Sequence, residues 1–460
     1  MMNDLFNQLF SRRQLLKTTS CGFGFLALAD LCTRIAAAES TNPLAPKAPH
    51  FKARAKHVIF MYMGGAPSHV DTFDYKPKLA ADNGKSADGK GNGRKLLKSP
   101  FKFSQHGKGG LWLPEIFPNL AKHADELCLL NSMYTDVAVH GSATSELHTG
   151  NFRFIRPSMG AWALYGLGTE NAELPGFITL NGAGGTANFS SGFLPASYQG
   201  TKIDAGGGDK KGGSQLANIA NPRLGAELQR KQLNMLSQLN RDKLGKDQIN
   251  PELEGLIESY ELAFRMEGAV PQVMDMSSET SKTKEAYGIG EKGTDNFGRQ
   301  CLLARRFVEA GVRFVELGAG GWDQHNNLKA KLTSNAHGID KPIAGLLEDL
   351  KQRDMLKDTL IVWGGEFGRT PAAQNDDGRD HNNKGFSMWM AGGGVKGGYR
   401  HGATDEHGAA AIDKKMHIND LHATMLYLLG LDHEKLTYRY SGRDYRLTDL
   451  AGVVAKDVVA

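Results

Sequence analysis

Three short clusters in the C-terminal half of the chain combine carboxylates with imidazole or guanidinium groups. Asp323 and His325 lie in the first cluster, Glu366 in the second and His381 in the third. Oxygen and imidazole ligands held on tight turns suit a hard or borderline divalent metal. The pattern predicts a divalent metal site, with zinc, calcium, magnesium and manganese all open, and a metal-dependent hydrolase. The clusters are Gly321–Asn327, Gly365–Pro371 and Gly378–His381.

The same side chains also have ordinary structural interpretations. Glu366 could form a loop ion pair with Arg369, and His381 could cap a helix. A histidine alone is often a satisfied core residue, but an Asp-x-His at a strand end followed by two asparagines is rarely one. The Asp323 and His325 pair therefore carries the metal hypothesis.

Each of the first two clusters follows a run that reads as a buried strand, and helical patterns separate the runs. Continuous apolar runs are typical of strands covered on both faces, and strands alternating with helices predict a parallel sheet. We predict an α/β fold, a three-layer sandwich with a mostly parallel central sheet. The predicted strands are His57–Met63, Leu127–Leu130, Val312–Leu317 and Thr359–Trp363, and the clearest helices are Asn296–Ala310 and His337–Gln352.

Ligands of open α/β sheets gather beyond the carboxyl ends of the strands, and further polar side chains fall there. His69 and Asp71 follow the first strand, and His140 and His148 follow the second. We expect Asp71 to return into the site as a metal ligand, at about even odds against a structural role.

One domain is predicted over residues 56–460, after a linker at 39–55. Glycine-rich stretches predict loop insertions at 83–110 and 181–222. Apolar residues at helical spacing predict a helical excursion over 223–270, broken near Pro251.

Residues 1–38 read as a twin-arginine signal peptide. Arg12 and Arg13 precede a moderately apolar run, and Ala36–Ala38 offers a cleavage site. Asp30 and Arg34 interrupt a run already shorter than the roughly 20 residues of a membrane span. We expect the twin-arginine translocation machinery as a partner, a periplasmic or extracellular location, and no stable membrane span in the mature form.

Composition argues against a nucleic-acid partner. The chain has 55 Lys and Arg against 50 Asp and Glu, and removal of the signal takes away four basic and two acidic residues, leaving 51 against 48. A polyanion binder usually concentrates positive charge on one face. The mature chain keeps Cys128 and Cys301, which we expect to be buried thiols rather than a bridge.

Three motifs resemble an exported bacterial family, domain-of-unknown-function family 1501, over nearly all of the mature chain. Their order is distantly similar to the alkaline phosphatase and sulfatase superfamily, which implies an alkaline-phosphatase-like fold. The motifs are Gly64–Asp74, Trp322–Asn326 and Gly365–Pro371.

The superfamily resemblance implies roles for several positions. His140 falls where sulfatases carry a cysteine that becomes formylglycine and where phosphatases carry serine or threonine. Asp323 and His325 resemble the Asp and His pair of two-metal members, and His381 resembles the final histidine ligand. Glu366 keeps a carboxylate at the late strand end.

The departures from the superfamily pattern bear on the mechanism. Phe367 stands where a second ligand is expected, which favours a single metal that activates water. We favour a ligand or acid/base role for His140. Arg369 is expected to clamp an anionic substrate oxygen. Asn326, His148 and His69 are candidates for contacts behind the ligands or to the substrate.

Two functions follow. The first is an exported metal-dependent hydrolase of a sulfate or phosphate ester, for which a polysaccharide is one candidate carrier. The second is a non-catalytic member of the same fold that binds a metal or a glycan. Replacement of the nucleophile by His140 favours the second, and retention of four candidate ligands favours the first, because converging carboxylates are costly to keep without a use.

Overall fold

The computed structural model describes residues 43–89, 93–181, 185–206, 225–247 and 251–460. The predicted signal peptide lies outside the described residues. Within them, no helix combines the length and the apolar character that crossing a bilayer requires. Cys128 and Cys301 are both buried free thiols, as predicted.

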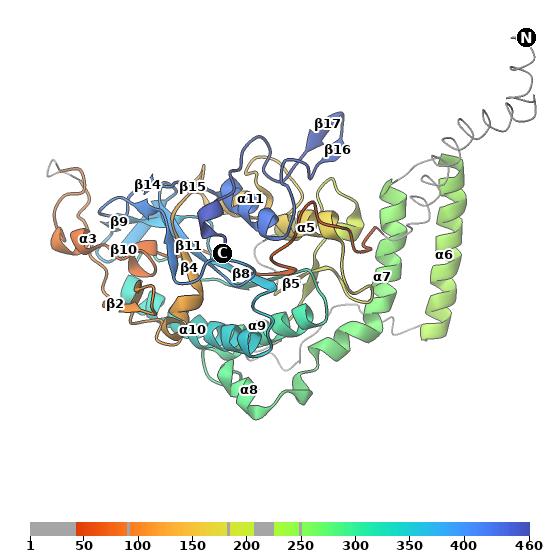
Figure 1. Cartoon of the computed structure of the whole chain (residues 1–460), viewed down its shortest axis with the longest axis horizontal. Helices are drawn as coiled ribbons and strands as arrows, with labels where there is room; N and C mark the ends of the chain where they lie inside the picture. Colours follow the sequence, from red (N-terminus) through yellow and green to blue (C-terminus); the bar gives the residue numbers. More distant parts are fainter. Residues whose placement is uncertain (1–42, 90–92, 182–184, 207–224, 248–250) are drawn as a thin grey trace, which may run out of the picture.

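A nine-stranded sheet forms the centre of the fold (Figure 1). Its order is β12-β4-β11-β8-β1-β7-β5-β6, with β15 added beside β4. β11 runs antiparallel to both of its neighbours, and the other pairings are parallel. Its strands are β1 (His57–Met63), β4 (Leu127–Tyr134), β5 (Phe177–Leu180), β6 (Thr201–Ile203), β7 (Phe314–Ala319), β8 (Thr359–Gly364), β11 (Phe386–Ala391), β12 (Tyr399–His401) and β15 (Met416–His417).

Four hairpins lie outside this sheet. They pair β2 (Phe103–His106) with β3 (Leu111–Pro114), β9 (Gly368–Gln374) with β10 (Gly378–Asn382), β13 (Ala403–Thr404) with β14 (Ala411–Asp413), and β16 (Tyr438–Tyr440) with β17 (Arg443–Tyr445).

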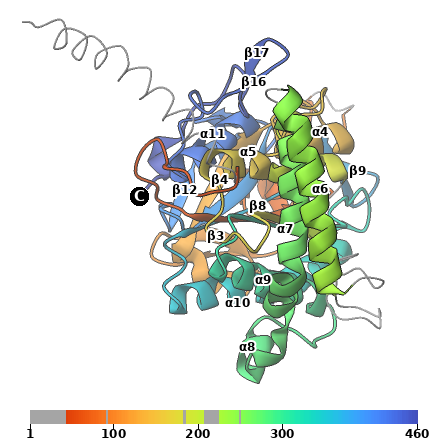
Figure 2. The same ribbon diagram turned by 90° about the vertical axis from the view of Figure 1, so that its right-hand side faces the viewer.

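Helices cover both faces of the sheet, which confirms the predicted three layers. In Figures 1 and 2, α5 and α11 lie on one side and α9 and α10 on the other. The helices are α3 (Pro77–Ala81), α4 (His140–Thr149), α5 (Met159–Leu167), α6 (Ala226–Asp247), α7 (Pro251–Met274), α8 (Ser281–Ala286), α9 (Asp295–Glu309), α10 (Leu328–Gln352) and α11 (Ile418–Leu428), with short 3-10 turns η1 (His69–Asp71), η2 (Leu120–Glu126), η3 (Thr186–Phe189), η4 (Ala196–Tyr198), η5 (Met276–Ser278) and η6 (Lys456–Val458).

The central strand β1 shows why the sheet forms where the sequence predicts it. All seven of its residues are buried, as expected of a parallel strand covered on both faces. Its end is fixed by Gly65, whose φ of +106° side chains rarely adopt. A Cβ on Gly65 would lie 2.6 Å from the backbone nitrogen of Asp323. Glycine therefore lets the turn after β1 approach the turn that carries Asp323.

The insertions agree only in part with the predictions. The excursion over 223–270 is a pair of long helices, α6 and α7, at the periphery of the body, and α7 begins at Pro251 (Figure 2). The segment 181–222, predicted as a loop, contributes the edge strand β6 to the central sheet. Periodicity could not reveal a strand of three residues in a glycine-rich stretch.

Candidate metal centre

Four side chains from three separate segments meet at the carboxyl edge of the sheet. Asp323 and His325 follow β7, His140 is the first residue of α4 after β4, and His381 lies in β10. One ligand atom from each of the four lies within 4.8 Å of the other three. The predicted convergence of Asp323, His325 and His381 is present, and His140 joins them.

The centre of this group is the carboxylate of Asp323. Its Oδ1 lies 2.8 Å from Nε2 of His325, 3.3 Å from Nε2 of His140 and 3.4 Å from Nε2 of His381. The Nε2 atoms of His325 and His381 are themselves 3.0 Å apart. Three imidazole nitrogens and one carboxylate oxygen thus face a common point.

The opposite nitrogen of each ring faces an oxygen. Nδ1 of His140 lies 2.6 Å from Oε1 of Glu366, and Nδ1 of His381 lies 2.8 Å from the carbonyl oxygen of Ala138. Nδ1 of His325 contacts the side-chain oxygen of Gln374. Each of these oxygens can accept a proton from Nδ1, and a ring that carries its proton there turns the lone pair of Nε2 to the centre.

This arrangement fits a bound cation. Burial lowers the pKa of His381, which favours its neutral form. Nη1 of Arg369 lies 3.5 Å from Nε2 of His325, and Nε2 of His140 is buried without a hydrogen-bond partner among the described residues. A positive ion at the common point would be coordinated by the three Nε2 atoms and by Oδ1 of Asp323. Metal-bound histidines are usually oriented by a hydrogen bond from the ring nitrogen that does not bind the metal, which here is Nδ1.

Arg369 holds the carboxylate of Asp323 in place by a hydrogen bond to Oδ1. Its side chain is fully buried, and Nη2 donates to Oδ1 of Asp323 at 2.5 Å and to the carbonyl of Gly65. Its Nε donates to the carbonyl of Ala66 at 3.0 Å. Burial opposes ionisation of Asp323, yet the guanidinium offsets it and lowers the pKa of this carboxyl to about 2. Because these protein oxygens occupy its donors, Arg369 positions Asp323 instead of making the predicted substrate contact.

Glu366 was predicted as a ligand but lies behind one. It is almost completely buried, and Oε1 accepts from Nδ1 of His140 and from the backbone N–H of Gly65 at 3.0 Å. This hydrogen bond raises the pKa of His140. The structure therefore gives Glu366 the task of orienting His140, and the four atoms that meet at the centre do not include its own.

Asp71 does not reach the centre. It is fully buried and forms a two-point ion pair with Arg379, at 2.6 Å from Nε to Oδ2 and 3.0 Å from Nη2 to Oδ1. Ser68 donates a further hydrogen bond to Oδ2 at 2.5 Å. Its oxygens are thus occupied by donors, which corrects the prediction of a metal ligand.

The three remaining predicted residues also lie outside the centre. His69 is buried and bonds the carbonyl of Gly408 at 2.8 Å. His148 is buried with Nε2 3.0 Å from the carboxylate of Glu316 in β7. Asn326 is exposed and bonds Lys331. His69 and His148 brace the core beneath the site, and Asn326 belongs to the surface.

Sequence reasoning missed two partners of the imidazoles. Gln374, at the end of β9, and the carbonyl of Ala138 have no signature beside the histidines that they orient. In the pairing of β9 with β10, His381 faces Arg369 while Gln374 faces Gly378, so the register alone does not point to Gln374. A backbone carbonyl has no sequence signature at all.

A second polar group, formed by Asp136, Glu146 and His417, differs from the first in its hydrogen bonds. Nδ1 of His417 accepts from the backbone N–H of Asn419 as the cap of α11. The ring proton is therefore left on Nε2, which lies 3.3 Å from Glu146 and 3.5 Å from Asp136. Because Nδ1 is occupied as the helix cap and Nε2 carries the proton, we assign the group a structural role.

A cleft of about 730 Å³ opens beside the centre. His140, Asp323 and Glu366 line it together with residues that follow β1, β5 and β7. The side chain of His140 is 34% exposed. Its size is in the range of small-molecule binding sites.

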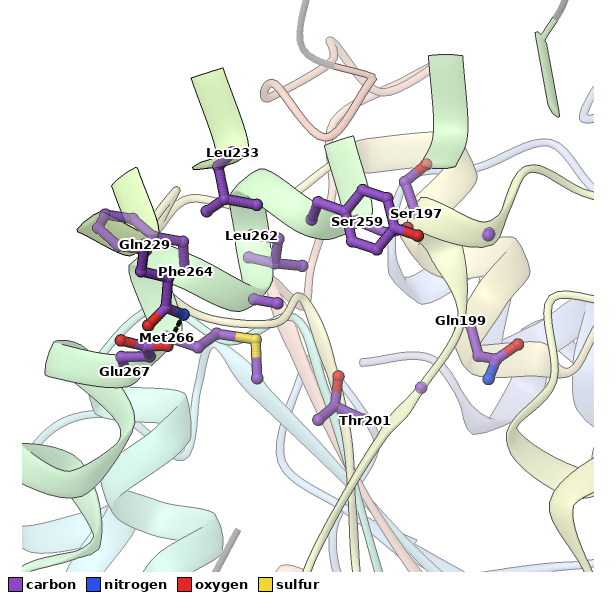
Figure 3. A pocket seen from close by; sticks show the side chains of 14 residues that line it. Ser197, Gln199, Thr201, Gln229, Leu233, Ser259, Leu262, Phe264, Met266 and Glu267 are labelled. Carbon is purple, nitrogen blue, oxygen red and sulfur yellow. Dashed lines mark hydrogen bonds between the residues drawn. The ribbon is translucent and has the colours of Figure 1, made fainter. Parts of the chain in front are cut away.

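Another cavity, of about 510 Å³, lies between the helix pair α6 and α7 and the segment from η4 to β6 (Figure 3). Leu233, Leu262 and Met266 contribute apolar surface to it, and Gln229 bonds Glu267 at its side. None of the four residues of the metal centre lines this cavity, so it is not a route to that centre.

Comparison with known proteins matches the chain to a family of unknown function. The model of the family described as "Protein of unknown function (DUF1501)" matches residues 55–459. A search of curated proteins found no significant match.

Solved structures similar to the chain include a synthase, a sulfatase and an alkaline phosphatase. The lipoteichoic acid synthase LtaP from Listeria monocytogenes is 10% identical with a TM-score of 0.40, covering 88% of this chain and 78% of that one. A sulfatase from Pseudoalteromonas sp. is 13% identical with a TM-score of 0.39, covering 88% and 72%. A variant of TAB5 alkaline phosphatase with bound Mg is 11% identical with a TM-score of 0.31, covering 74% and 92%.

Proposed function

We propose that this chain, which belongs to the DUF1501 family, is a metal-dependent hydrolase of sulfate or phosphate esters. One observation carries the proposal. Three Nε2 atoms, each opposite an occupied Nδ1, meet the carboxylate of Asp323 beside an open cleft that His140 and Asp323 line.

The ligand set narrows the metal. Imidazole nitrogen suits zinc and the neighbouring transition metals, whereas magnesium and calcium prefer oxygen throughout. We propose zinc held by His140, His325, His381 and Asp323. A zinc held there would need a further, open position for water, whose pKa it would lower, and it would polarise the ester oxygen.

The protein side chains have separate tasks in this proposal. Glu366 keeps a proton of His140 on Nδ1, so that Nε2 faces the common point of the four ligands. Arg369 keeps Asp323 ionised and in place. The cleft brings the ester to the exposed side of His140 and Asp323 while the buried side is closed by protein.

The first test combines elemental analysis with a panel of aryl sulfate and aryl phosphate esters. We expect about one zinc per chain in protein purified after cytoplasmic folding, and turnover of at least one ester class. His140→Ala removes one ligand and its contact with the cleft, so kcat/KM should fall by about 10²-fold or more. Turnover unchanged in His140→Ala would remove this ring from the chemistry.

The same panel decides between the two functions. A zinc-loaded protein that turns over none of the esters supports a non-catalytic metal- or glycan-binding member. The presence of an imidazole at the position that the superfamily resemblance assigns to the nucleophile favours this second candidate. The open cleft at His140 and Asp323 favours hydrolysis.

We also propose export by the twin-arginine route, supported by Arg12 and Arg13 ahead of the apolar run. Replacing both with lysine keeps the charge of the segment but removes the arginine pair. We expect the Arg12→Lys, Arg13→Lys variant to stay in the cytoplasm with its metal centre intact, as measured by cell fractionation. A single conservative change at Lys17→Arg serves as the control, and its distribution should match that of the wild type. Periplasmic accumulation of the double variant would contradict this route.

A further inference from the structure

The walls of the cleft carry no cationic side chain of lysine or arginine among the described residues that line it. The carboxylates Asp323 and Glu366 are present, and His140 belongs to the metal centre. Chains with several sulfate or phosphate groups are usually held by Arg or Lys. A second anionic group on a bound chain would face these carboxylates and would find no Arg or Lys side chain to bind it. The cleft therefore disfavours polyanions.

Hydroxyl and carboxylate groups supply the hydrogen bonding of the walls. The hydroxyls of Tyr62 and Thr144 are 2.8 Å apart and bond each other. Burial and the neighbouring Glu366 raise the pKa of Tyr62, so its phenol keeps its proton. The carboxylate of Glu366 is almost fully buried next to this phenol.

Glycines leave the cleft open. A Cβ added to Gly141, Gly185 or Gly320 would meet no atom within 4 Å. Such positions give an incoming chain access to backbone N–H and C=O groups, which can pair with hydroxyls in either role. The cleft thus combines room with neutral hydrogen-bonding groups.

We propose that the cleft binds an uncharged, hydroxyl-rich chain, a neutral glycan, with the single anionic ester at the metal centre. This substrate class rests on the hydrolase function proposed above. The proposed preference for a neutral glycan distinguishes this protein from hydrolases whose substrates carry anionic groups along their whole length.

Binding is measured first on the zinc-loaded protein, at a temperature and over a time in which no ester is released, so that the outcome does not depend on turnover. The probes are trisaccharides of glucose, galactose and mannose, each with one sulfate or with a sulfate on every sugar. Isothermal titration calorimetry is expected to give at least one singly sulfated probe a Kd about tenfold or more below that of its fully sulfated counterpart. Equal or tighter binding of every fully sulfated probe, or no binding of any probe, overturns the proposal.

A charge placed in the cleft provides a second test. Gly320→Lys should reduce the preference for the singly sulfated probe by about tenfold at low ionic strength, and added salt should weaken the effect. Gly320→Gln has a long uncharged side chain at the same position and should retain the wild-type preference. Gly268→Lys in α7, another open glycine position away from the cleft, should also retain it. A preference unchanged in Gly320→Lys contradicts the proposal.

The two proposals fail in different ways. Zinc-loaded protein that hydrolyses no ester, together with a retained preference for singly sulfated probes, overturns the hydrolase function and leaves a neutral-glycan site. Hydrolysis of polyanionic esters ahead of neutral ones overturns the substrate class and leaves the hydrolase.

Discussion

Protein that carries Asp323→Ala together with His325→Ala is expected to purify without zinc and to lose ester hydrolysis by a factor of about 10³ or more. The pair removes the carboxylate at which the three rings meet and the ring closest to it, at 2.8 Å. A metal contributes several kcal/mol to the transition state, and each 1.36 kcal/mol corresponds to about tenfold in rate. Elemental analysis and kcat/KM on the best ester of the panel measure the two effects.

A matched control comes from a second Asp and His contact. Asp82 and His407 lie 2.9 Å apart and belong to neither polar group described above. The Asp82→Ala, His407→Ala variant removes the same residue types and should keep both zinc and turnover. Wild-type protein that contains no metal, or a doubly substituted centre that retains it, would refute the assignment of the ligands.

Asp71→Ala is expected to destabilise the fold by roughly 3–5 kcal/mol, because it leaves the buried guanidinium of Arg379 without its carboxylate. Both side chains are fully buried in the ion pair. Arg379 also donates to the carbonyls of Leu97, Thr370 and Pro371, so it cannot turn to solvent without breaking those bonds. Denaturant unfolding gives the free energy, measured at a temperature where the variant is folded.

The comparison for this variant is a solvent-exposed ion pair. Asp444 lies 3.2 Å from Arg439, with both side chains more than half exposed. Asp444→Ala should cost no more than about 1 kcal/mol. The folded fraction of Asp71→Ala should bind zinc as the wild type does. Loss of zinc with little change in stability would instead restore Asp71 as a ligand.

The sequence was most informative where the physical constraint is local. The apolar run His57–Met63 coincides with β1, because a strand covered on both faces needs continuous apolar residues. The helix predicted from Asn296 to Ala310 is α9, shifted by one residue at each end. The hairpin near Pro251 was likewise evident from helical spacing. Segments without periodicity, such as the one that contains β6, were not predictable in this way.

For the metal centre, the sequence indicated which residues reach the sheet edge but not which way they point. Asp71 and Asp323 both follow central strands, yet the first pairs with Arg379, a partner 308 positions away. Glu366 is near enough to have been a ligand and instead holds His140 from behind. Such differences depend on side-chain direction and on distant partners, and neither is encoded in the spacing of nearby residues.

The position of β4 in the sheet has a consequence for biosynthesis. The strand that leads to His140 lies between β11 and β12, and its edge is extended by β15, so all of its neighbours come from the last 75 residues of the chain. While the ribosome is still making those residues, this strand has no partners and His140 has no fixed place. We expect capture of the ion to follow synthesis of β11, β12 and β15, and products of premature termination before β11 to remain metal-free.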